Sequence, residues 1–265
     1  MGKQLVKLNL ARNCLRYVIK TYNIGEIFVP YYICPTVLAA IRKEGCRIKF
    51  YHIDKNFRPK MEFFPDDYIL YPNYFGICAK QVVELSKKYK NLIVDNAHNF
   101  YMPNFGLASF CSLRKFFNVK DGAYLFVDKL TDAEFEADNY NYERFSSLSY
   151  DEMCLNEVRL NKEPIKLISE ITEKYFLEID TEEEKKKRLE EFFRLNRRFG
   201  DKNELEISLT EYDVPFVYPY LTYDETEAEK LEKEGYIILR YWNFLPENFS
   251  EYDFYRYLIP IPLRK

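Results

Sequence analysis

Residues 92–98 read Leu-Ile-Val-Asp-Asn-Ala-His (LIVDNAH), and this stretch decides the expected fold. Its first three residues are too apolar for a solvent-facing strand, so we predict a buried strand over residues 92–94. Asp95 follows at the end of that strand, where a buried carboxylate needs a cationic or proton-bearing partner. The same carboxylate could instead cap a following helix, and the stretch alone leaves both interpretations open.

The first half of the chain alternates predicted helices with predicted strands. Apolar residues at helical spacing predict helices over residues 8–21, 35–44 and 80–89. Short apolar or alternating runs predict further strands over residues 26–30, 47–53, 68–71, 106–112 and 123–127. Strands separated by helices of about ten residues are typical of βαβ units and of a mainly parallel sheet.

The pattern changes in the second half of the chain. There we predict helices over residues 164–177 and 182–199, then a strand, a helix and a strand over residues 216–222, 225–234 and 236–241. The charged run within residues 182–199 is typical of a solvated helix face and receives no binding role. The sequence therefore predicts an α/β fold with a large α/β domain over residues 1–150 and a small C-terminal α+β domain over residues 151–265.

Composition excludes several classes of function. The chain has 265 residues, 47% of them hydrophobic, which is enough for a large core, and its formal net charge of −3 argues against nucleic-acid binding. Two histidines, and six scattered cysteines without a C-x-x-C pair, argue against a zinc site and favour a reduced, cytoplasmic protein. We expect no secretory signal and no membrane span, since no apolar run is long enough. No glycine-rich phosphate loop is present.

Polar and aromatic residues mark five loops that are expected at one edge of the sheet. In parallel α/β sheets, ligands bind at the carboxyl ends of the strands. The five loops cover residues 11–14, 30–36, 73–76, 95–98 and 112–121. An aspartate that follows a buried strand can hold the pyridine nitrogen of pyridoxal phosphate (PLP), which keeps that cofactor an electron sink. His98 would then reach a neighbouring substituent of the ring.

Taken in order, these segments resemble the sugar-nucleotide aminotransferases of the DegT/DnrJ/EryC1/StrS family, which are PLP-dependent transferases of fold type I. ARNCL at residues 11–15 resembles the family's Gly-Thr-x-Ala-Leu helix start, and LIVDNAH resembles its Val-Ile-Glu-Asp-Ala-Ala-Gln/His. Other similar stretches are IFVPYYICPTVLAAI at residues 27–41, GCRIKFYHID at 45–54, YPNYFG at 71–76, VPFVYPYL at 214–221 and YLIPIPLR at 257–264. The resemblance thus covers nearly the whole chain.

The resemblance implies roles for the residues that match the family's motifs. Asp95 would bind the pyridine nitrogen of PLP, and His98 would lie at the ring hydroxyl. Arg12 and Ser112 would bind the cofactor phosphate, which the family holds at a helix N-terminus. Arg12 stands where the family has Thr, and it is alternatively a surface arginine of its helix.

Two further positions depart from the family's pattern. Cys34 stands where an aromatic residue should stack on the cofactor ring, so Tyr31 or Tyr32 is expected to substitute, and Cys34 is alternatively a buried structural cysteine. The family's Schiff-base lysine lies in Ser-Phe-x-x-x-Lys, but this chain has SFCSLRKFFNVKDGAYL over residues 109–125. That alignment puts the position on Arg114, so we predict the adjacent Lys115 as the Schiff-base residue.

Lys120 is the second candidate for that lysine, and both lysines are alternatively surface charges. As a member of the family, the chain would transfer an amino group from an amino donor to a keto-sugar nucleotide in surface-polysaccharide biosynthesis, as a homodimer. The second hypothesis is a catalytically degenerate protein of the same fold that serves as a binding or scaffold subunit. Compared with the family, we expect the chain to lack an N-terminal extension and the last helix, which help to build the dimer.

Overall fold

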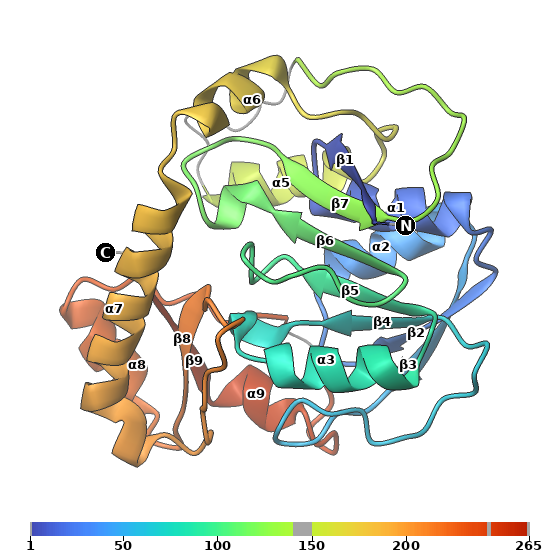
Figure 1. Ribbon diagram of the computed structural model, residues 1–265. Coiled ribbons are helices and arrows are strands. Elements are labelled where there is room, and N and C mark those ends of the chain that lie inside the picture. The colour runs from blue at the N-terminus through green and yellow to red at the C-terminus, as the bar shows by residue number, and fades with distance from the viewer. Residues whose placement is uncertain (1, 140–149, 243–244, 264–265) are drawn as a thin grey trace.

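The computed structural model describes residues 2–139, 150–242 and 245–263 (Figure 1). A seven-stranded sheet forms the centre of the larger part. In spatial order its strands are β1 (Gln4–Leu8), β7 (Ala123–Val127), β6 (Ala108–Ser112), β5 (Leu92–Asn96), β4 (Ile69–Pro72), β2 (Glu26–Pro30) and β3 (Arg47–Tyr51). The pairs from β6 to β3 are all parallel, whereas β7 is antiparallel to both β6 and β1. The predicted α/β fold with a mainly parallel sheet is confirmed.

Helices cover both faces of this sheet (Figure 1). On one face lie α1 (Ala11–Thr21) and α2 (Pro35–Lys43), and on the other lies α3 (Ala79–Lys88). Side chains alternate between the faces of a strand, so on β5 Ile93 packs with α1 and α2 while Leu92 and Val94 pack with α3. The same alternation directs Asp95, two residues after Ile93, toward the face that carries α1 and α2.

The C-terminal part is built around a two-stranded antiparallel sheet of β8 (Val217–Leu221) and β9 (Leu258–Pro262). Two helices, α5 (Tyr150–Leu160) and α6 (Glu170–Leu177), precede it along the chain. Its own helices are α7 (Thr181–Phe199), α8 (Thr226–Lys233) and α9 (Tyr252–Arg256). Short 3-10 helices are η1 (Tyr74–Gly76), η2 (Leu113–Lys115) and η3 (Gly200–Lys202). Phe192 and Leu195 of α7 and Leu231 of α8 share one buried cluster with side chains of both strands.

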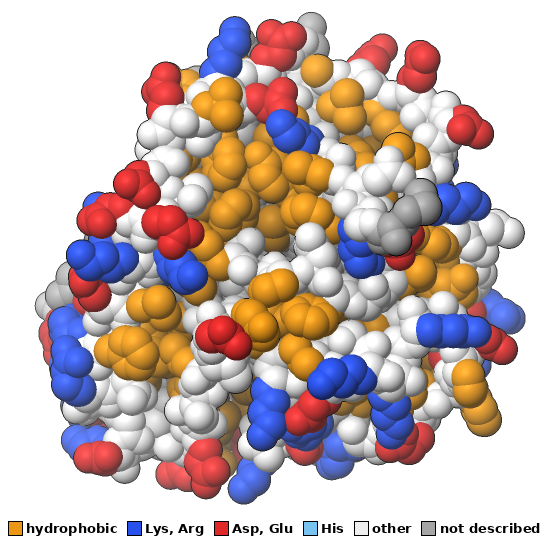
Figure 2. All heavy atoms as spheres, in the orientation of Figure 1, with side chains coloured by type: hydrophobic (Ala, Val, Ile, Leu, Met, Phe, Trp, Pro, Cys, Tyr) orange, Lys and Arg blue, Asp and Glu red, His pale blue; other side chains and the backbone are white. Residues whose placement is uncertain are grey.

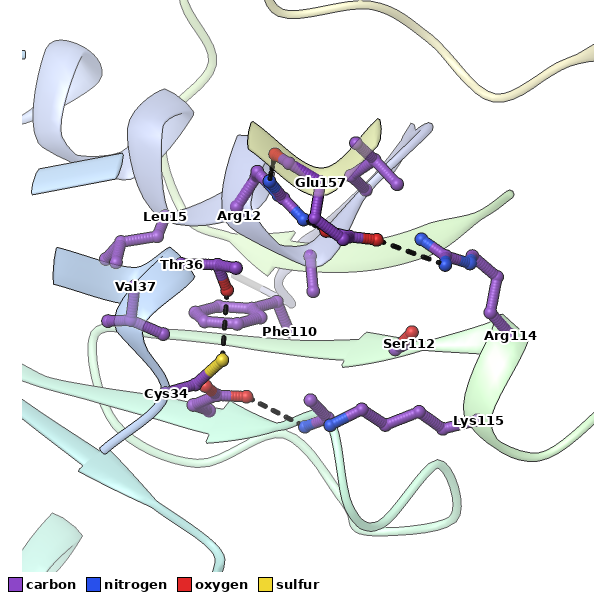
Figure 3. Close-up of a pocket in the computed structure, with 14 residues that line it drawn as sticks. Arg12, Leu15, Cys34, Thr36, Val37, Phe110, Ser112, Arg114, Lys115 and Glu157 are labelled. Atoms are coloured by element: carbon purple, nitrogen blue, oxygen red, sulfur yellow. Dashed lines mark hydrogen bonds and ion pairs between the residues drawn. The ribbon is translucent and has the colours of Figure 1, made fainter. Parts of the chain in front are cut away.

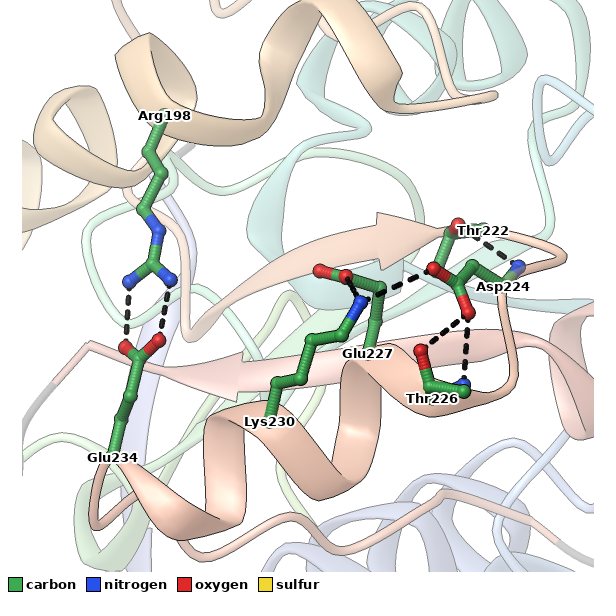
Figure 4. Close-up of polar contacts among 7 residues, drawn as sticks. All are labelled: Arg198, Thr222, Asp224, Thr226, Glu227, Lys230 and Glu234. Carbon is green, nitrogen blue, oxygen red and sulfur yellow. Dashed lines mark hydrogen bonds and ion pairs between the residues drawn. The ribbon is translucent and has the colours of Figure 1, made fainter.

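Most charged side chains of α7 and α8 lie at the surface, as expected for the charged run, but Arg188 is buried and donates to the backbone oxygens of Lys115, Phe116 and Phe216. Lys, Arg, Asp and Glu side chains mix along the side of the molecule where these helices lie (Figure 2). Arg198 near the end of α7 donates two hydrogen bonds, of 2.6 and 2.5 Å, to Glu234 just after α8 (Figure 4). Asp224 accepts from the backbone and side chain of Thr226 at the start of α8. Within the described ranges, no helix is both long and apolar enough to cross a bilayer.

Three predicted elements differ from the structure. The strand predicted over residues 236–241 is wrong, because these residues belong to no strand and β9 pairs with β8 instead. The helix predicted over residues 164–177 begins only at Glu170, because Leu167 bridges to Leu8 of β1. The helix predicted over residues 8–21 begins at Ala11 for the same reason, since Leu8 belongs to a strand. Pairing with distant backbone overrode local periodicity in each case.

Candidate functional site

A cavity of about 390 Å³ lies where the carboxyl ends of the parallel strands meet the N-termini of α1 and α2 (Figure 3). Its volume falls in the range of small-molecule sites, about 300–1,000 Å³. Among the predicted site residues, Arg12, Asp95, Ser112 and Lys115 all line it. The loops of residues 11–14, 30–36, 95–98 and 112–121 contribute to the lining, and the loop of residues 73–76 does not.

Asp95 is held at the end of β5 by its own turn. Its Oδ1 accepts the backbone N–H of Ala97 at 2.9 Å. Residues 97–107 form no helix, so the interpretation of Asp95 as a helix cap is wrong. Burial raises the pKa of the Asp95 carboxyl group, while the nearby Lys115 ammonium and the Ala97 N–H act in the opposite direction. A cation that entered the cavity would therefore find a carboxylate suited to pair with it.

Lys115 ends the short helix η2 that follows β6, and its side chain extends into the cavity (Figure 3). Its ammonium lies 5.4 Å from the ring centre of Phe216 and makes no hydrogen bond to any described residue. Burial lowers the pKa of Lys115, Cys34 and Asp95 raise it, and Arg114 lowers it further. A lowered pKa makes the neutral amine, which is the nucleophilic form, easier to reach than in an ordinary lysine. Lys120 does not line this cavity.

Two arginines stand on the opposite side of the cavity from Lys115 and Cys34 (Figure 3). Arg12 lies in the first turn of α1, whose N-cap residue, Leu10, has no capping side-chain hydrogen bond. Burial lowers the pKa of both Arg12 and Arg114 to about 10, so both remain cationic at neutral pH. Together with the positive end of the helix dipole, they form an anion-binding corner.

Glu157 on α5 also lines this corner, and sequence reasoning did not find it. Arg12 forms an ion pair with the Glu157 carboxylate and donates to its backbone oxygen at 3.0 Å. Arg114 lies 3.4 Å from Glu157 Oε1. The structure thus excludes the alternative that Arg12 is an exposed surface residue. No local signal marks Glu157, which is one of many acidic helix residues and lies 145 positions from Arg12.

His98 lies outside the cavity lining, inside an aromatic stack. Its ring lies 5.1 Å from that of Phe216 and 5.6 Å from that of Trp242, nearly parallel to both. Its Nδ1 accepts the backbone N–H of Phe75 at 3.3 Å. Burial, assisted by Lys115, holds the pKa of His98 well below its usual range, so the ring is neutral. Its predicted role at a ring hydroxyl stays a prediction.

The two tyrosines predicted to stack on a cofactor also lie outside the cavity lining. Tyr31 stacks on Phe50 with ring centres 4.8 Å apart, and Tyr32 is fully buried against Trp242 at 4.7 Å. Cys34 takes the place on the cavity wall, with its Sγ 3.1 Å from Thr36 Oγ1. Of Tyr31, Tyr32 and Cys34, the residue that lines the cavity is therefore Cys34.

The side chains of the cavity fit the chemical groups of PLP. Lys115 offers an amine for an aldehyde, Asp95 a carboxylate for a pyridinium, and Arg12 and Ser112 donors for a phosphate. The Lys115 amine, which has no hydrogen-bonding partner among the described residues, and the Asp95 carboxyl group, whose pKa is raised, are features that such a ligand would explain. Beside this fit, the Glu157 carboxylate already neutralises part of the anion-binding corner.

No protein-family model matches the sequence, and no curated protein matches it either. Solved structures match nearly the whole chain. PseC of Helicobacter pylori, an aminotransferase involved in the biosynthesis of pseudoaminic acid, has a TM-score of 0.63 at 16% identity over 98% of this chain and 81% of that one.

Two other solved structures give the same result. A DegT DnrJ EryC1 StrS aminotransferase from Brucella abortus has a TM-score of 0.61 at 13% identity, over 99% of this chain and 82% of that one. Spr1654 of Streptococcus pneumoniae, in its PLP form, has a TM-score of 0.63 at 13% identity, over 100% and 83%. The predicted resemblance is confirmed at the level of structure: the chain has the fold of the PLP-dependent sugar aminotransferases of fold type I.

Proposed function

We propose that this chain is a PLP-dependent aminotransferase that acts on a keto-sugar nucleotide in surface-polysaccharide biosynthesis. The observation that carries the proposal is that the Lys115 amine and the Asp95 carboxylate line one cavity beside an anion-binding corner. The substrate class rests on likeness to sugar aminotransferases, and fold alone does not determine a substrate. A homodimer in the cytoplasm, with a nucleotide sugar and an amino donor as ligands, belongs to the same proposal.

Each cavity residue has a distinct role in this proposal. PLP, when bound, supplies an electron sink for breaking a bond at the substrate carbon that bears nitrogen. Lys115 provides the attaching amine and moves a proton at its Nζ, which its lowered pKa favours. Asp95 keeps the pyridine nitrogen protonated by facing it with a carboxylate. Ser112 and Arg12 hold the phosphate, with α1 directing its N-terminus toward it.

A second function, a binding or scaffold subunit without catalysis, is favoured by one observation. Glu157 is paired with both arginines of the anion-binding corner, so the corner is partly neutralised without a ligand. A protein that never bound PLP would keep this arrangement permanently.

Borohydride reduction separates the two functions. We expect the purified chain, incubated with PLP, to show a yellow absorbance band that borohydride bleaches while fixing the cofactor covalently to Lys115, as seen by peptide mass spectrometry. Lys115→Ala should lose the band and the label, because no other lysine in the described part of the chain lines the cavity. Lys120→Ala is the matched control and should retain both. Absence of any labelled lysine in the unaltered chain would refute the transaminase proposal and leave the binding subunit.

A further inference from the structure

Arg12 and Arg114, which we call the arginine pair, share a single carboxylate from α5 (Figure 3). Glu157 pairs with Arg12 through its side chain and accepts from Arg12 through its backbone oxygen at 3.0 Å. Its Oε1 lies 3.4 Å from Arg114 Nη2. All three residues line the cavity that contains Asp95 and Lys115. The arginine pair therefore has an anionic partner inside the chain, at the corner where a phosphate would bind.

The partners of this contact differ in how firmly they are held. The side chain of Arg12 is only 7% exposed, whereas that of Glu157 is 30% exposed. Arg12 is also hydrogen bonded to the Asn161 side chain. Glu157 can therefore turn into water at small cost, while Arg12 stays in place.

A phosphate group should bind the arginine pair more strongly than the Glu157 carboxylate does. At neutral pH it has a charge of about −1.5 to −2 and three acceptor oxygens, against one charge and two oxygens for a carboxylate. Guanidinium groups bind such oxygens in pairs of parallel hydrogen bonds. Two anions at the same corner would repel each other, so phosphate and the Glu157 carboxylate cannot both bind the arginine pair without weakening each other's binding.

We propose that Glu157 competes with the cofactor phosphate for the arginine pair and leaves the pair when phosphate binds. The identification of the phosphate with that of a cofactor rests on the proposed function. In the cofactor-free protein, Glu157 neutralises the pair, which burial would otherwise make costly. The affinity of the chain for the cofactor is then set partly by a residue that the bound cofactor does not need.

The test is the affinity of the full chain for inorganic phosphate, measured by isothermal titration calorimetry at low ionic strength. Glu157→Gln keeps the shape of the side chain and removes its charge, so we expect it to tighten phosphate binding by about two- to fivefold, the range expected for a partly exposed ion pair. Glu170→Gln, an equal charge change at an exposed site on α6, is the control and should leave the affinity unchanged. Unchanged or weaker binding by Glu157→Gln would overturn the proposal.

A second measurement does not depend on the variant being folded. In the unaltered chain, hydrogen exchange of the α5 peptide should become faster when inorganic phosphate is added, because Glu157 is released from the arginine pair. Slower or equal exchange would count against competition.

Failure of this inference can be told apart from failure of the proposed function. If phosphate binding tightens in Glu157→Gln but borohydride labels no lysine, competition holds and the transaminase proposal fails. If Lys115 is labelled but the phosphate affinity of Glu157→Gln does not rise, the enzyme proposal holds and competition is refuted.

Discussion

At Asp95, burial raises the pKa of the carboxyl group, and the Lys115 ammonium and the Ala97 N–H oppose this only in part. A carboxyl group whose folded-state pKa exceeds its unfolded value opposes folding once it ionises. The free energy of unfolding therefore falls as pH rises from the unfolded-state pKa of Asp95 through its folded-state pKa. A salt-bridged aspartate shows the reverse. A residue retained under such conditions is typical of a site that serves a ligand rather than stability.

Asp95→Asn should make the cofactor-free protein more stable at pH 7. The amide oxygen can still accept the Ala97 N–H, and the cost of a buried charge disappears. We expect a gain of about 0.5–2 kcal/mol in the free energy of unfolding, measured by urea denaturation at pH 7. The difference between variant and unaltered chain should shrink toward about pH 3, below the unfolded-state pKa, where Asp95 is mainly protonated in both states. A loss of stability at pH 7 would show that Asp95 already has a stabilising cationic partner in the protein.

At the scale of elements, the backbone of η1 lies in close contact with the turn that follows β5. Gly76 ends η1 with φ of 78°, and a Cβ atom added there would lie 2.1 Å from the backbone oxygen of His98 and 2.9 Å from that of Val214. The loop of residues 73–76 therefore supports the segment that carries Asp95, although it does not line the cavity. Here glycine is required by backbone contact as well as by the positive φ.

Gly76→Ala should destabilise the chain by about 2–4 kcal/mol, because backbone atoms of two other segments must move. Gly45→Ala is the matched control. Gly45 has a similar φ of 69° but no atom within 4 Å of the added Cβ, so its cost should be about 1 kcal/mol of backbone strain alone. Denaturant unfolding of both variants measures the two costs. Equal costs would mean that the segment after β5 yields freely, contrary to its role as a rigid support.

At the scale of the whole molecule, the buried carboxylate of Glu251 links the C-terminal part to the edge of the large sheet. Glu251 has 0% exposed surface and accepts the backbone N–H of Ile53 at 2.6 Å. His52 Nδ1 lies 3.0 Å from its other oxygen. Ser250 and Glu251 thus fasten the segment before α9 to residues that directly follow β3.

Glu251→Ala should cost about 1–3 kcal/mol of unfolding free energy, because the Ile53 N–H would lose its acceptor in a buried place. Glu247→Ala, which removes an exposed carboxylate four residues earlier, should change stability by less than about 0.5 kcal/mol. Thermal unfolding monitored by circular dichroism compares the two. If both variants unfold at the same temperature, the Glu251 contact does not hold the C-terminal part to the sheet.

Contacts between α5 and α1 cross the domain boundary that the sequence predicts at residue 150. α5 follows that position, yet Glu157 and Asn161 bind Arg12 on α1. We propose that α5 belongs functionally to the cavity of the large part, whatever the boundary of the folding units.

The sequence by itself determined the sheet and the cavity that its strand ends build. Apolar strands bounded by polar loops are local patterns, so the apolar run of LIVDNAH predicted a buried strand with Asp95 near its end, as β5 has it. That the Lys115 side chain lines the cavity whereas Lys120 does not, and that β8 pairs with β9, were decided only by tertiary structure. So were the packing of Tyr31 and Tyr32 against aromatic rings away from the cavity and the contact of Glu157 with the arginine pair. These depend on which distant segments meet, and no local periodicity contains that information.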